Sequence, residues 1–322
     1  MTLKQKLLSH FLSNQNSPIS GGELEKQFSV TRSAIWKVVN ELKKDGFLIE
    51  SKDRSGYVFL GDGDVLCREA IEQNLTTKSL GRGIEILDSI DSTNFYLKRI
   101  LPKAEGYCVI ADMQTGGHGR RERVFSSPKG GIYLSVLLKP ALPPEELQFM
   151  TLCTAVAVCE ALEKICHFAP QVKWINDIYY NGKKLVGIST GASFSAENMS
   201  LESVIIGIGI NVQKVKGTFE DIAISLEEIT GKKGFRNALI SEVLNRLEEC
   251  YNLFAAGCKK EILEKYKNRC FLLGNVITVC DGSKQYEANA SHLTENGALV
   301  VVDALGNKKI LNTEEISVRI TF

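Results

Sequence analysis

Residues 114–125 form a glycine- and arginine-rich stretch whose composition indicates a ligand-binding site. It reads Gln-Thr-Gly-Gly-His-Gly-Arg-Arg-Glu-Arg-Val-Phe, with three glycines and three arginines between Gly116 and Arg123. Glycines leave backbone amides open to a ligand, and guanidinium groups stay charged and bind phosphate in a forked geometry. The stretch therefore favours a phosphate-bearing ligand. A solvated basic loop, or a second patch for nucleic acid, explains these residues equally well.

Residues 173–178, Lys-Trp-Ile-Asn-Asp-Ile, place polar side chains among apolar ones at the end of an expected strand. Buried polar groups need partners, so Lys173, Asn176 and Asp177 are either paired within the fold or bound to a ligand. Lys184 opens the next apolar run, where an ammonium group is costly unless an anion lies beside it. These positions indicate a site for an anionic ligand.

Two further polar motifs flank this region. Residues 206–211, Ile-Gly-Ile-Gly-Ile-Asn, predict a strand whose glycines allow close backbone approach and whose final amide can contact a base edge. Residues 91–94, Asp-Ser-Thr-Asn, are typical of a helix start, with Ser92 or Thr93 as the capping residue.

Spacing excludes several nucleotide and metal sites. The chain has no G-x-x-x-x-G-K-[ST] loop and no G-x-G-x-x-G after a strand, so neither a P-loop nor a dinucleotide fold is supported. Its nine cysteines include no C-x-x-C pair, and its four histidines lie far apart. We therefore expect no disulfide framework and no metal held by the protein.

The first 60 residues predict a winged helix-turn-helix that positions part of the function. Apolar spacing indicates three helices, the second capped by Ser20 with Glu23 and the third ending at Gly46. Two apolar runs then form a hairpin with a basic tip at residues 52–56. The expected elements cover residues 3–13, 20–28, 32–45, 47–51 and 57–60.

The outer face of the third helix indicates what this module binds. A major groove about 12 Å wide admits one helix, and no acidic side chain interrupts the first two turns of this face. A dimerisation or adaptor module is the alternative, because residues 1–60 carry only nine Lys or Arg against six Asp or Glu. The candidate DNA-binding residues are Thr31, Arg32, Ser33, Trp36, Lys37, Lys52 and Arg54.

The remaining sequence predicts a mixed domain followed by a small β-barrel. Residues 152–162 are apolar nearly all round, which is typical of a helix buried against a sheet. We expect an α+β multidomain chain with domains at residues 1–63, 64–270 and 271–322, and a linker or hinge at Gly61–Asp64. The expected helices lie at about 66–75, 92–101, 145–167 and 236–256. The expected strands lie at 107–111, 132–138, 172–180, 184–190, 202–213, 276–279, 286–290, 299–302 and 316–320.

Composition sets the protein class. The chain has 322 residues, of which 44% are apolar and 24% charged, with a net charge of +1, as in an ordinary globular protein of two or three domains. No apolar run has the length of a membrane-spanning helix, and the N-terminus lacks a secretory-signal pattern. We expect a cytoplasmic protein without a membrane partner.

Five motifs, in this order and spacing, resemble those of the biotin-protein ligases. The resemblance spans nearly the whole chain, and the winged helix makes the chain similar to the bifunctional subgroup that also represses biotin operons. It implies a central mixed α/β ligase domain and a C-terminal SH3-like β-barrel. The motifs are Asp91-Ser-Thr-Asn, Gln114 with the glycine-arginine stretch, Lys173-Trp-x-Asn-Asp, Lys184-Leu-x-Gly-Ile and Gly207-Ile-Gly-Ile-Asn-Val.

The resemblance implies a reaction in two steps. Biotin and MgATP give biotinyl-5′-adenylate and pyrophosphate, and the biotinyl group then passes to a lysine of biotin carboxyl carrier protein. Repulsion between two anions opposes the first step, and Lys184, with Arg120, would offset it by bridging the carboxylate and the α-phosphate. In the second step Asp177 would take the proton of the acceptor lysine, or it would instead orient Lys173 or a backbone amide.

The resemblance also implies the ligand contacts and a regulatory partner. If ligand binding favours a homodimer, two winged helices would meet the half-sites of a palindromic operator, so DNA binding would report unused adenylate. Biotin would contact Ser92, Thr93, Asn94, Gln114, His118, Gly119, Arg120 and Lys184. ATP and the adenylate would contact Arg121, Arg123, Phe125, Lys173, Asn176 and Asn211.

Four positions depart from the family pattern. His118 and Glu122 stand where the loop usually has arginine and glycine, Phe125 replaces tryptophan, and Ile175 replaces proline. The first two lower the charge of the loop by about two units, which leaves the retention of the adenylate open.

Two other functions compete with this one. A transcription factor could bind biotin or its adenylate as a signal without transferring it, but the retained Lys184 and Asp177 argue against that function. A lipoate or octanoate ligase has a related catalytic domain, and the winged helix and terminal barrel argue for biotin instead.

Overall fold

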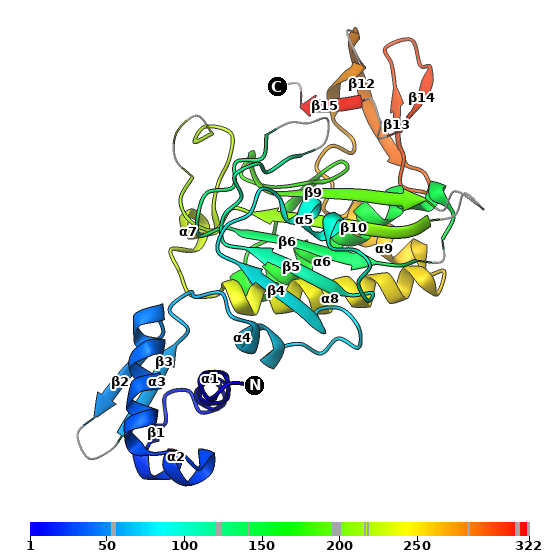
Figure 1. Ribbon diagram of the computed structural model, residues 1–322. Helices are drawn as coiled ribbons and strands as arrows, with labels where there is room; N and C mark the ends of the chain where they lie inside the picture. The colour runs from blue at the N-terminus through cyan, green and yellow to red at the C-terminus, as the bar shows by residue number, and fades with distance from the viewer. Residues whose placement is uncertain are drawn as a thin grey trace. The chain divides into compact units, whose positions relative to one another are not determined.

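A computed structural model describes the protein over residues 1–52, 56–119, 124–140, 142–194, 201–215, 217, 219–281, 284–312 and 316–320 (Figure 1). The chain divides into two compact units. The smaller unit holds residues 1–76 and 232–242, and the larger unit holds residues 77–231 and 243–322. The three-domain division expected from the sequence stays a prediction.

The helices are α1 (Leu3–Ser13), α2 (Gly21–Phe28), α3 (Arg32–Asp45), α4 (Arg68–Gln73), α5 (Thr93–Arg99), α6 (Leu147–Cys166), α7 (Leu226–Thr230), α8 (Arg236–Ala255) and α9 (Lys259–Lys267). The strands before residue 200 are β1 (Pro18–Ile19), β2 (Leu48–Lys52), β3 (Gly56–Gly61), β4 (Gly83–Leu87), β5 (Tyr107–Ala111), β6 (Ile132–Leu138), β7 (Gln171–Lys173), β8 (Asp177–Tyr180) and β9 (Lys183–Phe194). The later strands are β10 (Leu201–Ile210), β11 (Val276–Asp281), β12 (Lys284–Leu293), β13 (Leu299–Val302), β14 (Lys308–Leu311) and β15 (Ile316–Ile320).

The smaller unit is the predicted winged helix-turn-helix, with α1 to α3 and a sheet of strand order β1-β3-β2. The α3 helix begins where Thr31 accepts a hydrogen bond from the Ala34 amide at 3.3 Å. It ends at Gly46, whose φ of +110° suits a residue without a side chain. The predicted capping box of Ser20 and Glu23 is also present at the start of α2.

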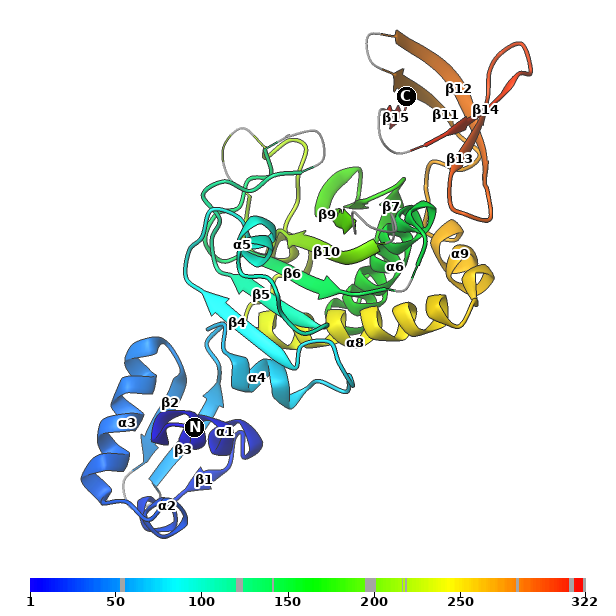
Figure 2. The ribbon, with the colours of Figure 1, turned by 45° about the vertical axis from the view of Figure 1, so that its right-hand side comes forward.

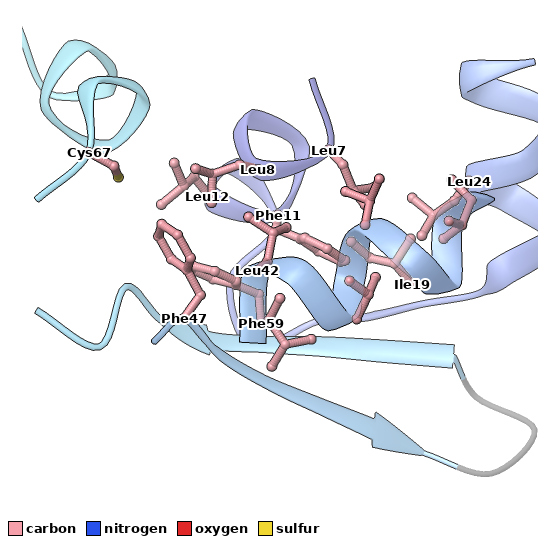
Figure 3. Packing of buried hydrophobic residues seen from close by; sticks show 14 of the residues in the cluster. Leu7, Leu8, Phe11, Leu12, Ile19, Leu24, Leu42, Phe47, Phe59 and Cys67 are labelled. Carbon is pink, nitrogen blue, oxygen red and sulfur yellow. The ribbon is translucent and has the colours of Figure 1, made fainter. Parts of the chain in front are cut away.

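One apolar core holds these helices against the sheet (Figure 3). Phe11 of α1 and Phe59 of β3 stack with 5.9 Å between ring centroids, and both are fully buried. Leu42 of α3 joins them in the core. Truncating such a buried ring to alanine costs about 3–5 kcal/mol, so the core fixes which face of α3 stays outside.

Residues 61–64, expected as a linker or hinge, lie within the smaller unit and not between the two units. Asp64 Oδ2 accepts from Arg236 Nε at 3.0 Å, and Asp62 Oδ2 accepts from Asn237 Nδ2 at 2.7 Å. Both partners are buried residues at the start of α8, and both belong to the smaller unit. Side-chain hydrogen bonds to a segment distant in sequence, which local composition does not encode, therefore hold this stretch in place.

The larger unit is built on a mixed sheet of strand order β4-β5-β6-β10-β9-β8-β7, in which β4 and β5 are parallel and the other pairs antiparallel. On one face, Leu97 of α5 packs with Val109, Leu137 and Ile205 of the sheet. On the other face lies α6, which is buried along most of its length as predicted. Successive side chains alternate between faces, so Ser135, Ser189 and Gly207 belong to the face of α5.

The expected strand at 172–180 is instead a hairpin of β7 and β8. Trp174 and Ile175 lie in its turn and are buried, and Trp174 Nε1 donates to the Gly297 carbonyl at 2.9 Å. The sequence is apolar here because the turn is buried. Periodicity alone does not distinguish a buried turn from a buried strand.

The C-terminal segment forms its own antiparallel sheet of strand order β14-β13-β12-β11-β15, drawn from orange to red in Figure 2. This sheet confirms the all-β segment predicted after residue 272. Its β14 strand was not predicted, nor were β4, α7 and α9. Among the described residues, no helix is both long and apolar enough to span a membrane.

Candidate active site

A cavity of about 690 Å³ lies in the larger unit. Its lining comes from the start of α5, from residues within 114–119, 124–131, 174–176, 211–215 and 219–223, and from the strands β6, β7, β8, β9 and β10. Arg120, Arg121 and Arg123 lie outside the described residues. The other predicted ligand-site residues all line this cavity: Ser92, Thr93, Asn94, Gln114, His118, Gly119, Phe125, Lys173, Asn176, Asp177, Lys184 and Asn211.

A row of residues crosses three neighbouring strands beside the cavity, and its members Gly207 and Ser189 line the cavity floor. Ser135 on β6, Gly207 on β10 and Ser189 on β9 stand directly opposite one another. The Asn94 amide lies over the glycine, because its Oδ1 accepts from Ser135 Oγ at 2.6 Å and its Nδ2 donates to Ser189 Oγ at 2.8 Å. A Cβ on Gly207 would stand 2.4 Å from Asn94 Nδ2. The absence of a side chain on Gly207 therefore leaves room for the Asn94 amide.

Gln114 joins two segments of the cavity wall. Its Oε1 accepts from Thr93 N at 2.8 Å and from Thr93 Oγ1 at 3.1 Å, and its Nε2 donates to Ser127 Oγ at 2.9 Å. These bonds use both ends of the amide, so the side chain has one defined orientation.

The expected helix start at residues 91–94 is confirmed, but the side-chain capping bond expected from Ser92 or Thr93 is absent. Ser92 occupies the N-cap position of α5 without a side-chain capping bond, and Thr93 Oγ1 donates to Gln114. Asp91 instead accepts from the Ser92 amide at 2.7 Å and pairs with both terminal nitrogens of Arg99. The Arg99 hydrogen bonds, followed by the Ser92 bond, lower the pKa of the Asp91 carboxyl to about 2.

Lys184 and Asp177 form an ion pair inside the cavity, with 2.7 Å between Nζ and Oδ1. The distance is that of a charge-assisted hydrogen bond, but the angles are not, and in the described part of the chain Asp177 Oδ1 is buried without an aligned donor. Lys184 thus has the anionic partner that its sequence position predicted. Lys173, the other proposed partner of Asp177, has its Nζ 5.5 Å from the centre of the Tyr179 ring.

Phe125 covers the neighbouring part of the floor. Gly187 on β9 and Gly209 on β10 are paired, and a Cβ on them would lie 2.9 Å and 2.5 Å from carbons of the Phe125 ring. The ring centre is 5.8 Å from Lys184 Nζ. An aromatic ring and an ammonium group therefore share this end of the cavity.

Asn211 is oriented by the backbone around it. Its Nδ2 donates to the carbonyls of Lys184 at 3.4 Å and Ile224 at 3.2 Å, which uses both amide hydrogens. The oxygen Oδ1 is left to accept a hydrogen bond, which fits an exocyclic amino group of a base better than a ring nitrogen. Asn176 is held similarly, since its Nδ2 donates to the Ile188 carbonyl at 2.8 Å.

His118 stands at the rim, where the family pattern has arginine. Its ring lies against Phe95 with 5.5 Å between centroids, and one ring nitrogen contacts the Gly116 carbonyl. The imidazole therefore packs between α5 and its own loop.

Some site residues carried no clear sequence signal. Ser135 is fully buried within an apolar strand, and a lone serine in such a run was the available clue. Ser127, Ser189 and Tyr179 had none, because hydroxyl groups are common on half-buried strands and loops. Burial raises the pKa of Tyr179 to about 12, so its phenol stays protonated at neutral pH.

The predicted DNA-binding residues gather in the smaller unit. Trp36 is 61% exposed on α3, an unusual exposure for the largest side chain. Thr31 serves chiefly as the N-cap of α3, where its Oγ1 also lies 3.0 Å from Ser33 Oγ. Arg54 lies outside the described residues. The exposed members of the predicted set are Thr31, Arg32, Ser33, Trp36, Lys37 and Lys52.

Comparisons with known proteins agree with this architecture. Residues 86–211 match the Biotin/lipoate A/B protein ligase family, and residues 4–58 match an HTH domain. Among solved structures, the chain is similar to the biotin protein ligase from Aquifex aeolicus in complex with biotin and ATP, with a TM-score of 0.65 and 31% identity over 74% of this chain and 100% of that one.

Curated relatives extend the similarity to the N-terminal unit. The chain is 28% identical to the bifunctional ligase/repressor BirA of Escherichia coli (strain K12), over 88% of this chain and 87% of the relative. It is 32% identical to the bifunctional ligase/repressor BirA of Bacillus subtilis (strain 168), over 97% of this chain and 98% of the relative. Since that identity covers nearly the whole of both chains, the protein belongs to the biotin protein ligase family, in its bifunctional ligase/repressor group.

Proposed function

We propose that the cavity forms biotinyl-5′-adenylate from biotin and ATP and then transfers the biotinyl group to a lysine of biotin carboxyl carrier protein. The observation that carries the proposal is the Lys184–Asp177 pair, a cation and a carboxylate held together in a cavity. The two charged groups suit the two steps, because the first brings anions together and the second must remove a proton.

In the first step a biotin carboxylate oxygen attacks the α-phosphorus of ATP, and pyrophosphate leaves. The carboxylate is ionised at neutral pH, so the step needs positive charge rather than a base. Lys184 supplies it between the two anions, together with Arg120 and with Arg121 and Arg123 over the phosphates. Asn211 accepts from the adenine amino group, and Phe125, Lys173 and Asn176 complete the adenylate contacts.

The biotin ring lies, in this proposal, against the wall that carries the two hydrogen-bonded amides. Ser92, Thr93, Asn94 and Gln114 contact it there, and His118 and Gly119 close the rim.

In the second step the acceptor lysine amine attacks the acyl carbon, and AMP leaves. An ordinary lysine has a pKa near 10.4, so the amine must lose a proton first. Asp177 would accept it in this proposal, which the lack of an aligned donor to its Oδ1 among the described residues supports.

We propose that Mg²⁺ enters with ATP. Asp177 is the one carboxylate among the described residues that line the cavity, so phosphate and water oxygens would supply most of the ligands. The ion would neutralise charge on the phosphates.

The exposed face of α3 supports a second activity, repression of biotin genes by binding operator DNA. We propose that the protein binds as a homodimer, so that two winged helices reach two half-sites. Sedimentation with and without biotin and ATP tests ligand-linked dimerisation, and an unchanged mass would contradict it. A cytoplasmic location remains part of this proposal.

Transfer to a carrier tests the enzymatic proposal. Purified protein with biotin, MgATP and a biotin carboxyl carrier domain should add one biotin to the carrier, as measured by mass spectrometry. A carrier with its acceptor lysine changed to arginine is the control. Bound biotin without any transfer would favour a biotin-responsive repressor, and transfer of lipoate or octanoate instead would favour that class of ligase.

A further inference from the structure

The row Ser135–Gly207–Ser189, of which Gly207 and Ser189 line the cavity floor, bears on substrate choice. The two serines flank a glycine, and the Asn94 amide bridges them, accepting from Ser135 Oγ and donating to Ser189 Oγ. Gly207 is required for this arrangement, because a Cβ there would stand 2.6 Å from Ser189 Oγ and 2.4 Å from Asn94 Nδ2.

The structure orients the Asn94 amide with its oxygen toward Ser135 and its nitrogen toward Ser189. Ser135 is fully buried, and its Oγ lies 2.6 Å from Asn94 Oδ1 and 2.7 Å from Thr93 Oγ1. Ser189 Oγ receives a hydrogen from Asn94, so its own hydrogen is free to point elsewhere.

Ser189 lines the cavity, and the described residues provide no acceptor for its hydroxyl hydrogen. Asn94 lines the cavity too, so the pair presents a hydrogen-bond donor to whatever lies on the floor. A ligand that covers this donor without accepting from it leaves the donor buried and unpaired, which is costly.

We propose that Ser189, held by Asn94, is a specificity-determining residue of the acid-binding site, whose hydroxyl donates to a hydrogen-bond acceptor on the ring of the bound acid. The proposal rests on the proposed function and adds to it the residue that selects acids whose ring carries a good acceptor, such as a cyclic urea. An alkyl acid such as octanoate offers no acceptor at this position. A site built to hydrogen-bond its substrate rejects analogues that lack the partner.

The chain offers a matched control on the same strand. Ser193 lies on the same face of β9, and its hydroxyl contacts Ser203 Oγ at 2.6 Å on the neighbouring strand. Ser193 lies outside the set of lining residues. Ser189→Ala and Ser193→Ala therefore remove the same group from the same strand, inside and outside the cavity.

The test is the biotin KM and kcat of pyrophosphate exchange into ATP, with thermal unfolding of each variant without ligand. Ser189→Ala should raise the biotin KM about three- to tenfold, the effect of one lost hydrogen bond, with kcat within about twofold. Ser189→Thr, which keeps the hydroxyl, and Ser193→Ala should stay within about twofold of wild type. A wild-type KM for Ser189→Ala overturns the inference, as does a threonine variant with the KM of the alanine variant.

A second variant keeps the test open if Ser189→Ala fails to fold. Asn94→Asp replaces the amide donor by an acceptor, so the Ser189 hydrogen turns toward residue 94 and away from the ligand. Its biotin KM should rise at least as far, and an unchanged KM overturns the inference. Failure of the proposed function and failure of this inference give different results. If the wild-type protein shows no biotin-dependent exchange, the proposed function is wrong. If it shows exchange and the Ser189→Ala variant has the same biotin KM, this inference alone is wrong.

Discussion

Lys184 of β9 and Asp177 of β8 are paired across neighbouring strands, with 2.7 Å between Nζ and Oδ1. The side chains are 31% and 22% exposed, so the pair is partly shielded from water and the two charges influence each other strongly. A bound anion must therefore share the ammonium group with Asp177. The pair links the two proposed steps, because any change at one residue alters the charge that the other experiences.

Lys184→Ala should abolish most adenylate formation. It removes the cation that separates the biotin carboxylate from the α-phosphate, and such an electrostatic loss costs about 3–4 kcal/mol, or two to three orders of magnitude in rate. Pyrophosphate exchange measures this step alone. Lys183→Ala is the control, since Lys183 Nζ donates to the Glu220 carbonyl at 2.8 Å and lies outside the lining. Near-normal exchange by Lys184→Ala would remove the residue from the mechanism.

Asp177→Asn should slow transfer more than adenylation. The amide cannot take a proton from the acceptor lysine, so transfer from preformed adenylate should fall about a hundredfold and recover as pH rises toward the lysine pKa. Exchange should fall less than about tenfold. If both steps fell equally at every pH, Asp177 would instead act by positioning Lys184.

The elements that bear most of the core were predictable from the sequence. The bounds of α3, β5 and β6 match the expected ones, because their apolar residues face one core and their periodicity is unbroken. The missed β14 reads Lys-Lys-Ile-Leu with three exposed residues, and β4 has a single buried position. Short edge strands, stabilised by pairing rather than by burial, leave little periodicity to read.

The site was predictable in its charged and amide residues but not in its hydroxyls. Lys184 and Asp177 stand out because buried charge demands a partner. Ser189 acquires its importance from Gly207 on the next strand and from Asn94, which is distant in sequence, and the sequence does not state the register that joins them. The bonds made by residues 61–64, expected as a linker or hinge, were unpredictable for the same reason, since Asp64 finds Arg236 only in the folded chain.

Gly207→Ala should damage the floor of the site. Its Cβ would displace the Asn94 amide, so we expect the biotin KM to rise at least about tenfold and the unfolding temperature to fall by several degrees. Gly191→Ala is the control on β9, because its Cβ meets no atom nearer than 4.0 Å. Equal behaviour of the two variants in exchange and thermal unfolding would contradict this account of the floor.

Trp36→Ala should weaken DNA binding. The ring is exposed on α3 and is expected to contact the duplex, so affinity for duplexes selected from a random pool should fall about tenfold. Fluorescence anisotropy at fixed salt measures the affinity, and pyrophosphate exchange serves as the folding control. Unchanged affinity would place the DNA contact elsewhere.

Asp91 should contribute to stability above acidic pH. Its folded pKa of about 2 lies below the ordinary value near 3.9, so its contribution is present above pH 4 and is lost as pH falls toward 2. Urea unfolding of wild type should therefore weaken more than that of Asp91→Asn between pH 5 and pH 3, by a modest amount because the pair is half exposed. The exposed Asp88, changed to asparagine, is the control, and identical pH profiles for wild type and Asp91→Asn would contradict the assignment.

The most direct test of the central claim is exchange of labelled pyrophosphate into ATP by the wild-type protein, with biotin, lipoate or octanoate as the acid. The account predicts exchange that depends on biotin and is at least about tenfold weaker with the other two acids at equal concentration. Exchange that prefers lipoate or octanoate, or no exchange by folded protein that still binds biotin, would contradict it.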